Sequence, residues 1–369
     1  MIDMTQVNVG KNYNLSRVMF WVKNLFLAGL NVVRQNQSLK EVVIRVLRYG
    51  GYLIGVIVMQ QVSLSFHFLK FRYSLARIIM KSGLLFIGTI TSLLFCSVSA
   101  KVISIDGIVH PESAFTTRDG RIFVSEIGGV GKKGDGRILE VFTNGQKKVI
   151  ASGLNDPKGL LVEGKTIYVT DVDQIKKVSF DGEVTSWIGP NDFPRKISFL
   201  NDLTIDRNTI IYVSDSGEVV NGERRGGAVY RISSTGKISL LVDSANDPNI
   251  QAPNGLLAFQ RGYLMVADFT TGVLSRIRLR NFSVETMAEG FGGGDGLAFS
   301  GTKLYISDWR GGKIWSIDLT APGQNPKIFK KGFTNPADID VTSDGKFLVV
   351  PEMMKATTDG GRVNFIPIK

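Results

Sequence analysis

From residue 101 to its end, the sequence predicts an all-β fold, a six-bladed β-propeller built from four-stranded blades. Three observations lead to this prediction. Short β-branched and aromatic runs alternate with Gly, Asp and Asn, and no 3.6-residue periodicity is present. One motif recurs six times at intervals of roughly 40 to 50 residues, the period of propeller blades. The sixth repeat is one strand short.

Each repeat predicts two successive hairpins. The first hairpins are, in order, HPESAFTTRDGRIFVSE, DPKGLLVEGKTIYVTD, LNDLTIDRNTIIYVSD, APNGLLAFQRGYLMVAD, GGDGLAFSGTKLYISD and NPADIDVTSDGKFLVVPE. A second hairpin such as GRILEVFTNGQKKVIA follows, so a repeat has four strands. After the last repeat only GGRVNFIPIK remains, so we expect segment 101–106 (KVISID) to complete blade six and protect both exposed strand edges.

One column of the repeat gathers oxygen-bearing side chains at the start of the innermost strands. Its members are Glu112, Lys158, Asn201, Asn254, Asp295 and Ala337. Two carboxylates and two amides around one channel suit a hard divalent cation, so we predict a calcium site at Glu112, Asn201, Asn254 and Asp295. Zn²⁺, Mn²⁺ and Mg²⁺ are alternative ions. The competing interpretation is that Asn and Asp only cap turns.

A second acidic column ends the second strand of every repeat. Its members are Glu126, Asp171, Asp215, Asp268, Asp308 and Glu352. A feature shared by all six repeats most simply serves the repeat itself, so we predict a structural role. Each carboxylate is expected to accept backbone N–H groups in the turn that follows it.

The motifs around the first column resemble those of a known family. ESAF (112–115), NDLTID (201–206), NGLLAF (254–259) and DGLAF (295–299) are similar to the metal-site motifs of gluconolactonases and senescence-marker-protein-like lactonases, and more distantly of paraoxonases. The resemblance covers residues 101–369. It implies a six-bladed propeller with a catalytic calcium held by Glu112, Asn254 and Asp295, with Asn201 close to the metal or the substrate.

Two residues depart from the family pattern. Paraoxonases use a histidine pair near the metal, but after residue 100 the sequence has only His110, so that mechanism cannot be transferred. Lys158 places a cation in the metal column. It could pair with Glu112 or Asp295, bind an acidic group of the substrate, or extend into solvent.

The connections between the second and third strands are expected to surround the metal end of the channel. Three are long and Gly-rich, at 127–136, 216–227 and 353–361, which is typical of a lid or specificity rim. Two short ones begin with Phe269 and Trp309. With Arg310, Lys158, Asn201 and His110, these aromatics are our candidate substrate-binding residues. Lys and Arg residues in the rim favour an anionic or polyhydroxylated small molecule; the alternative is a solvated charged rim.

The charge excess lies ahead of this domain. Of a net charge of +11, residues 1–79 contribute ten Lys or Arg against Asp3 and Glu41, so the sequence gives no reason to expect nucleic-acid binding by the propeller. Residues 80–100 have the order of a secretory signal, with an apolar core at 84–95 and Val98-Ser99-Ala100 as cleavage site. Either translation starts at Met80, or the segment is an uncleaved membrane anchor.

Both interpretations place the propeller in the periplasm or outside the cell. The only cysteine, Cys96, lies within the signal, so no disulfide is expected in the mature domain. Our leading hypothesis is a calcium-dependent hydrolase of lactones in which Asp295 is the base. The alternatives are a non-catalytic propeller that binds a ligand or a protein, and a strictosidine-synthase-like condensing enzyme.

Overall fold

In the computed structural model the chain forms two compact units, residues 1–96 and 97–369. In the N-terminal part the structure describes residues 45–49 and 52–56, which form an antiparallel pair of strands, β1 (Arg45–Tyr49) and β2 (Tyr52–Val56). The sequence did not predict this pair. In the second part, the structure describes residues 102–129, 131–260, 262–321, 325–354 and 360–368. The predicted signal segment lies outside the described residues. Within those residues, no helix has the length and apolar character needed to cross a membrane.

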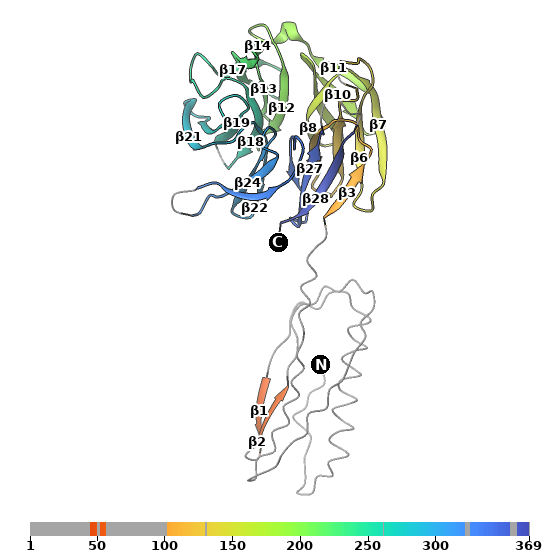
Figure 1. Ribbon diagram of the computed structural model, residues 1–369, viewed down its shortest axis with the longest axis vertical. Coiled ribbons are helices and arrows are strands. Elements are labelled where there is room, and N and C mark those ends of the chain that lie inside the picture. The colour runs from red at the N-terminus through yellow and green to blue at the C-terminus, as the bar shows by residue number, and fades with distance from the viewer. Residues whose placement is uncertain are drawn as a thin grey trace. The chain divides into compact units, whose positions relative to one another are not determined.

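The second part is a six-bladed β-propeller of four-stranded antiparallel sheets, as predicted (Figure 1). Blades one and two contain β4 (Pro111–Thr116), β5 (Ile122–Glu126), β6 (Gly136–Val141) and β7 (Lys147–Leu154), then β8 (Pro157–Glu163), β9 (Thr166–Asp171), β10 (Gln174–Ser179) and β11 (Val184–Ile188). Blades three and four contain β12 (Leu200–Ile205), β13 (Ile211–Asp215), β16 (Ala228–Ile232) and β17 (Ile238–Asp243), then β18 (Pro253–Phe259), β19 (Tyr263–Asp268), β20 (Val273–Arg278) and β21 (Ser283–Glu289).

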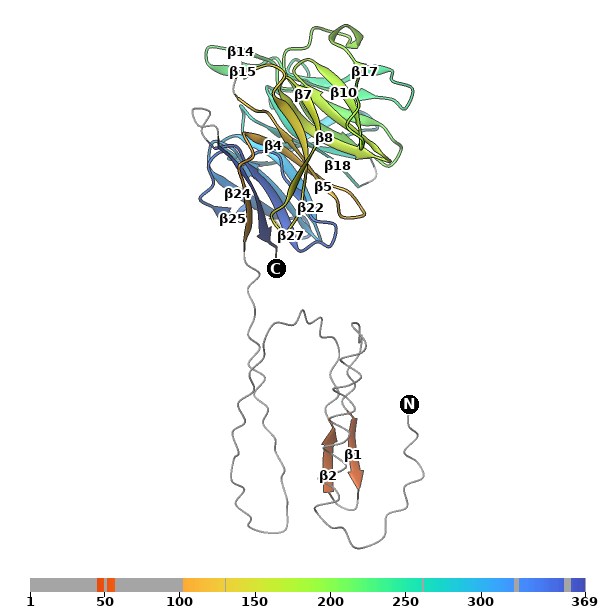
Figure 2. The ribbon, with the colours of Figure 1, turned by 90° about the vertical axis from the view of Figure 1, so that its right-hand side faces the viewer.

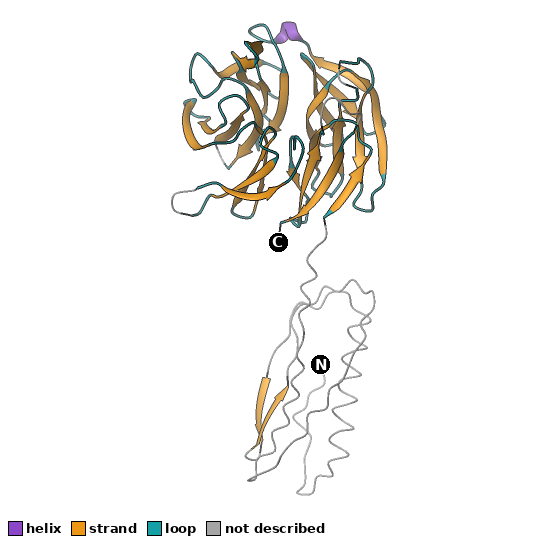
Figure 3. Cartoon of the chain, viewed as in Figure 1, coloured by secondary structure: helices purple, strands orange, loops and turns teal. Residues whose placement is uncertain are grey.

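Blades five and six complete the ring. They contain β22 (Gly294–Ser300), β23 (Lys303–Asp308), β24 (Lys313–Asp318) and β25 (Lys327–Lys331), then β26 (Asp340–Val341), β27 (Phe347–Glu352), β28 (Arg362–Pro367) and β3 (Ile103–Asp106). Among the described residues the one helical element is a single 3₁₀ turn, η1 (Pro190–Asp192), coloured purple in Figure 3.

The first strand of the domain closes the last blade, as predicted. β3 pairs antiparallel with β28, which places Ile105 opposite Val363 and Ile103 opposite Phe365. In Figure 1 the orange β3 lies beside the dark blue β28. The two ends of the domain therefore share one sheet, and β3 covers the edge of β28 that would otherwise be exposed.

The core lies between blades rather than inside any one of them. One cluster joins Phe123 and Ile138 of blade one to Leu160 and Val169 of blade two, and the other clusters repeat this arrangement around the ring. The six inner strands β4, β8, β12, β18, β22 and β26 pack in this order, and β26 returns to β4. Because these strands surround the channel, their first residues all face one end of it.

Candidate functional site

A β-bulge opens the innermost strand of five blades and positions the predicted ring. In blade one, Pro111 pairs with Glu126 and Ala114 with Val124, so two residues oppose the single Ser125. The same register shift occurs in β8, β12, β18 and β22. The first bulged residues are Glu112, Lys158, Asn201, Asn254 and Asp295. A bulge turns a side chain out of the regular alternation, so these side chains are redirected at the channel end.

The second bulged residue is held by the neighbouring strand or is a glycine. Ser125 and Ser307 accept hydrogen bonds at their Oγ atoms from the N–H groups of Ser113 and Gly296, at 2.9 and 2.7 Å. At Gly255 a side chain would collide with the carbonyl group of Asp295 on the next blade. The inner strands therefore approach so closely that only glycine fits there.

Three ring oxygens are buried and have no hydrogen-bond partner among the residues that the structure describes. They are Glu112 Oε2, Asn254 Oδ1 and Asp295 Oδ1, from side chains of residues 5%, 4% and 4% exposed. Buried polar atoms are nearly always paired, so three unpaired acceptors in one ring require an explanation. Two carboxylates and an amide carbonyl are ligands that a hard divalent cation accepts, and this donor set fits the predicted calcium.

Burial makes the ionised forms of Glu112 and Asp295 unfavourable when no cation is present. Burial raises the pKa of Glu112 well above its usual range; Asp295 raises it further, and Lys158 opposes this. Burial likewise raises the pKa of Asp295, with a contribution from Asp338, while Lys158 and a hydrogen bond from the Asn254 side chain lower it. A positive ion among these groups would relieve the cost of both carboxylates.

Asn201, the fourth predicted ligand, is tied to the wall of the channel. Its Nδ2 donates to Ser216 Oγ at 3.3 Å, and that hydroxyl donates to the Pro253 carbonyl oxygen at 2.9 Å. The backbone carbonyl of Asn201 accepts from Thr170 Oγ1 at 2.5 Å. Asn201 therefore connects blades two, three and four beside the three unpaired oxygens.

Lys158 turns inward rather than into solvent. Its Nζ lies 2.5 Å from Asp156 Oδ1 and 4.7 Å from the centre of the Phe199 ring, and only 7% of its side chain is exposed. It pairs with neither Glu112 nor Asp295, although it lowers the pKa of both. Its ammonium group thus adjoins the ring while its direct partner is Asp156, a residue that the sequence analysis did not identify.

His110 has one nitrogen available for a ligand. Its Nδ1 lies 2.7 Å from the Gly128 carbonyl oxygen, which can only accept, so in the neutral imidazole Nδ1 is the donor and Nε2 the acceptor. Nε2 is buried and has no partner in the described part of the chain, and the backbone has a left-handed φ of 49°. His110 stands two residues before Glu112, so its imidazole belongs to the same end of the propeller.

The predicted aromatic residues lie together at the rim. The ring centres of Phe269 and Trp309 are 5.7 Å apart, and the Arg310 guanidinium lies 4.5 Å from the Phe269 ring centre. Trp309 Nε1 donates to Met353 Sδ at 3.4 Å, so blade six fixes the indole. Lys355, in the third long connection, lies outside the described residues.

The connection 216–227 contains a hairpin that the sequence analysis missed. β14 (Glu218–Val220) and β15 (Glu223–Arg225) pair antiparallel and lie at one edge of the molecule in Figure 2. Glu223 forms an ion pair with Arg310 of blade five at 2.9 Å, and the carbonyl oxygen of Arg224 accepts from Thr270 of blade four. The hairpin therefore spans from blade three to blades four and five.

The second acidic column is structural, but its main partners differ from those expected. In every blade the carboxylate accepts an N–H from the segment that enters the innermost strand, for example Val109 to Glu126 at 2.7 Å and Ala252 to Asp268 at 2.7 Å. Among the described residues, only Asp215, Asp268 and Asp308 also accept from the following turn, as predicted. The column thus fixes the entry of each inner strand, upstream of the ring.

Two further buried carboxylates come one residue after the ring column in the sequence. Asp202 and Asp338 are the second residues of their motifs, and burial raises the pKa of Asp202 well above normal and that of Asp338 to about 7. Asp202 accepts from the Leu256 N–H at 2.6 Å and Asp338 from Ser113 Oγ at 2.6 Å. A column comparison across all blades could have found them, because the other blades have Ser or Gly there.

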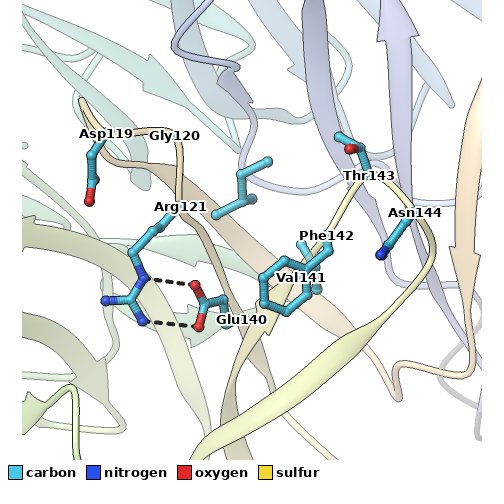
Figure 4. A pocket seen from close by; sticks show the side chains of 9 residues that line it. Asp119, Gly120, Arg121, Glu140, Val141, Phe142, Thr143 and Asn144 are labelled. Carbon is cyan, nitrogen blue, oxygen red and sulfur yellow. Dashed lines mark hydrogen bonds and ion pairs between the residues drawn. The ribbon is translucent and has the colours of Figure 1, made fainter.

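A hollow at the opposite end of blade one does not belong to this site. It is lined by Asp119, Arg121, Glu140 and Phe142 among others (Figure 4). Arg121 is already bound by both Glu140 oxygens, at 2.7 and 2.9 Å, so it has its counter-charge. This hollow lies at the turn between the first two strands, the far end from Glu112.

Comparison with protein-family models and with curated proteins finds no match for this chain. Among the residues that the structure describes, no three His, Cys, Asp or Glu side chains form a metal-binding group. The ring contains two carboxylates, and its remaining oxygen donors are amides. Its geometry and chemistry therefore carry the functional argument alone.

Proposed function

We propose that this protein is an extracytoplasmic, calcium-dependent hydrolase of lactones. The observation that supports it most is the set of three buried, unpaired oxygens on Glu112, Asn254 and Asp295, contributed by blades one, four and five. These residues coincide with the metal-site motifs of the lactonase resemblance. Zn²⁺, Mn²⁺ and Mg²⁺ are alternative ions for the same oxygens.

Glu112, Asn254 and Asp295 would hold the cation, with Asn201 beside it. The cation would polarise the ester carbonyl and stabilise the oxyanion that develops there. Asn254 orients Asp295 by a side-chain hydrogen bond and leaves Asp295 Oδ1 unpaired. In our proposal Asp295 removes a proton from the attacking water. The aromatic rim at Phe269 and Trp309 would receive the apolar face of the ring substrate.

Hydrolysis of lactones is the direct test. Screening aldono-lactones, simple γ- and δ-lactones and aryl esters by proton release should reveal turnover of at least one lactone, and a chelator should abolish it. Asp295→Asn keeps an oxygen but removes the base, so kcat should fall by a factor on the order of 10². Glu140→Gln also replaces a carboxylate by an amide, but at the opposite end of blade one, where Glu140 binds Arg121; it should lower stability and leave turnover per folded molecule intact.

Two results would contradict the proposal. If no lactone or ester is hydrolysed while calcium binds, the protein is a binding propeller and the hydrolase proposal fails. If Glu140→Gln lowers turnover per folded molecule as much as Asp295→Asn does, Asp295 has no special role in catalysis.

A further inference from the structure

A second group of charged residues adjoins the ring, between blades two and three. The guanidinium carbon of Arg224 lies 3.5 Å from the centre of the Phe199 ring, and Lys158 Nζ lies 4.7 Å from the same point. Phe199 precedes β12, two residues before Asn201. Two cationic groups therefore lie against the aromatic side chain of Phe199, close in sequence to the predicted ligand Asn201.

The two carboxylates nearby meet the two cations in different ways. Asp156 binds Lys158 at 2.5 Å, and it also acts electrostatically on Arg224. Asp215, the other carboxylate that acts on Arg224, accepts the N–H groups of Phe199 and Gly217 at 2.8 and 3.1 Å. Among the described residues, Lys158 thus has a direct ion pair with a carboxylate and Arg224 has none.

Arg224 keeps most of its donors free. Its Nη1 donates to the Gly217 carbonyl oxygen at 2.8 Å, and among the described residues no acceptor faces Nε or Nη2. Burial lowers the pKa of this guanidinium, and the electrostatic effects of Asp215 and Asp156 oppose this only in part. A guanidinium presents its N–H groups as a planar fork that matches the two oxygens of an oxyanion.

The arrangement is held in place in advance. The carbonyl oxygen of Arg224 accepts from Thr270 Oγ1 at 2.9 Å, and Glu223 on the same strand pairs with Arg310 at 2.9 Å. These contacts fasten the β14–β15 hairpin to blades four and five. A donor fixed before binding loses little conformational entropy when its ligand arrives.

We propose that Arg224 and Lys158 on Phe199 form a subsite for an oxyanion substituent of the substrate. The inference rests on the proposed function and narrows it to lactones that carry a carboxylate or a phosphate group. The ester carbonyl lies at the oxygen ring, and the charged substituent extends toward the β14–β15 hairpin. Neutral lactones lack the partner for the free N–H groups of Arg224 and are the poorer substrates.

The kinetic test uses three δ-lactones that differ only in one substituent: neutral, carboxylate-bearing and phosphate-bearing. The protein should show a higher kcat/KM for at least one charged lactone, and the two charged arms distinguish carboxylate from phosphate. Arg224→Met should reduce the charged-to-neutral ratio of kcat/KM roughly tenfold, as loss of a charge-assisted hydrogen bond predicts. Arg225→Met removes the same charge from the next residue, which points to the opposite face of β15, and should preserve the ratio.

A binding measurement separates this inference from the proposed function. Calorimetric titration with sulfate, without lactone, should show binding that Arg224→Met weakens roughly tenfold and Arg225→Met leaves unchanged. Sulfate binding through Arg224 without any lactone turnover would support the oxyanion subsite and contradict the hydrolase. The subsite alone would be overturned if lactones are hydrolysed, the charged-to-neutral ratio of kcat/KM is equal in wild type, Arg224→Met and Arg225→Met, and none of them binds sulfate.

Discussion

At the residue scale, three of the residues at the β-bulges are also the predicted metal ligands. Glu112, Asn254 and Asp295 each stand where the ladder skips a residue, and each presents an unpaired oxygen. Burying unpaired acceptors costs free energy that a purely structural ring would avoid by apolar residues. Ala337 in blade six shows that the fold accepts an apolar residue at this position. The oxygens are therefore retained at a cost, as expected of a ligand site.

Stability of the metal-free protein should rise as the pH falls from 7.5 to 5.5. Burial raises the pKa of Asp338 to about 7 and that of Asp340 to about 6, above about 3.9 in an unfolded chain. The folded state thus binds protons more tightly, so protonation stabilises it and the gain is lost as the pH rises through these values.

Thermal unfolding at both pH values measures this effect. Asp340→Asn removes one titrating group and should reduce the change in melting temperature between the two values. A melting temperature that falls on acidification, in wild type and variant alike, would show that these carboxylates are ionised in the folded state at no cost.

At the element scale, closure by β3 should contribute measurably to stability. Ile105 is 3% exposed and packs with Val363 and Phe365 between blades six and one. Ile105→Ala should lower the free energy of unfolding by about 2 to 4 kcal/mol, since it leaves a cavity in this cluster. Val102→Ala, just outside the strand at an exposed position, is the control. If chemical unfolding gives the same loss of unfolding free energy for both variants, closure by β3 does not stabilise the propeller.

The sequence predicted the ring column but not the device that positions it. Six aligned repeats were enough to place Glu112, Asn254 and Asp295 at equivalent positions, because strand period and repeat length are local properties. The β-bulge is a mismatch between two strands, and one strand alone gives only indirect signals of it. Such signals were present: Gly159, Gly255 and Gly296 follow ring residues, and Ser or Thr often precedes the second acidic column.

The β14–β15 hairpin and the position of Lys158 were beyond sequence reasoning for different reasons. Strands of three residues are too short to show an alternation, so the connection 216–227 was predicted only as a long loop. The Lys158 side chain has many rotamers, and its direction depends on Asp156 and Phe199 across the channel wall. Its partners come from two blades, and their proximity is a property of the assembled ring.

At the scale of the whole molecule, the order of segments predicts the location of the propeller. Cleavage after Ala100 would release the domain just before β3, the strand that closes blade six. We expect the mature chain to begin at Lys101 and to be found outside the cytoplasm. N-terminal sequencing of the protein from its native host checks this. A chain that begins at Met1 with the propeller in the cytosol would contradict it.

The cation should also stabilise the whole propeller, because the three unpaired oxygens belong to blades one, four and five. A cation held there connects strands that are far apart in the sequence and binds only the folded state, so it should raise the melting temperature with its concentration. Without a cation, Glu112→Gln should be at least as stable as wild type, since it removes a buried carboxyl with a raised pKa.

Calcium titration of the metal-stripped protein, followed by melting temperature, tests the central claim most directly. The wild type should become more stable as calcium increases, and Glu112→Gln should lose most of that gain. Glu352→Gln, which weakens hydrogen bonds to Thr334 and Arg362 away from the ring, should melt lower yet keep the full calcium response. A wild type that does not respond to calcium, or a Glu112→Gln variant that responds as fully as wild type, would contradict the cation site.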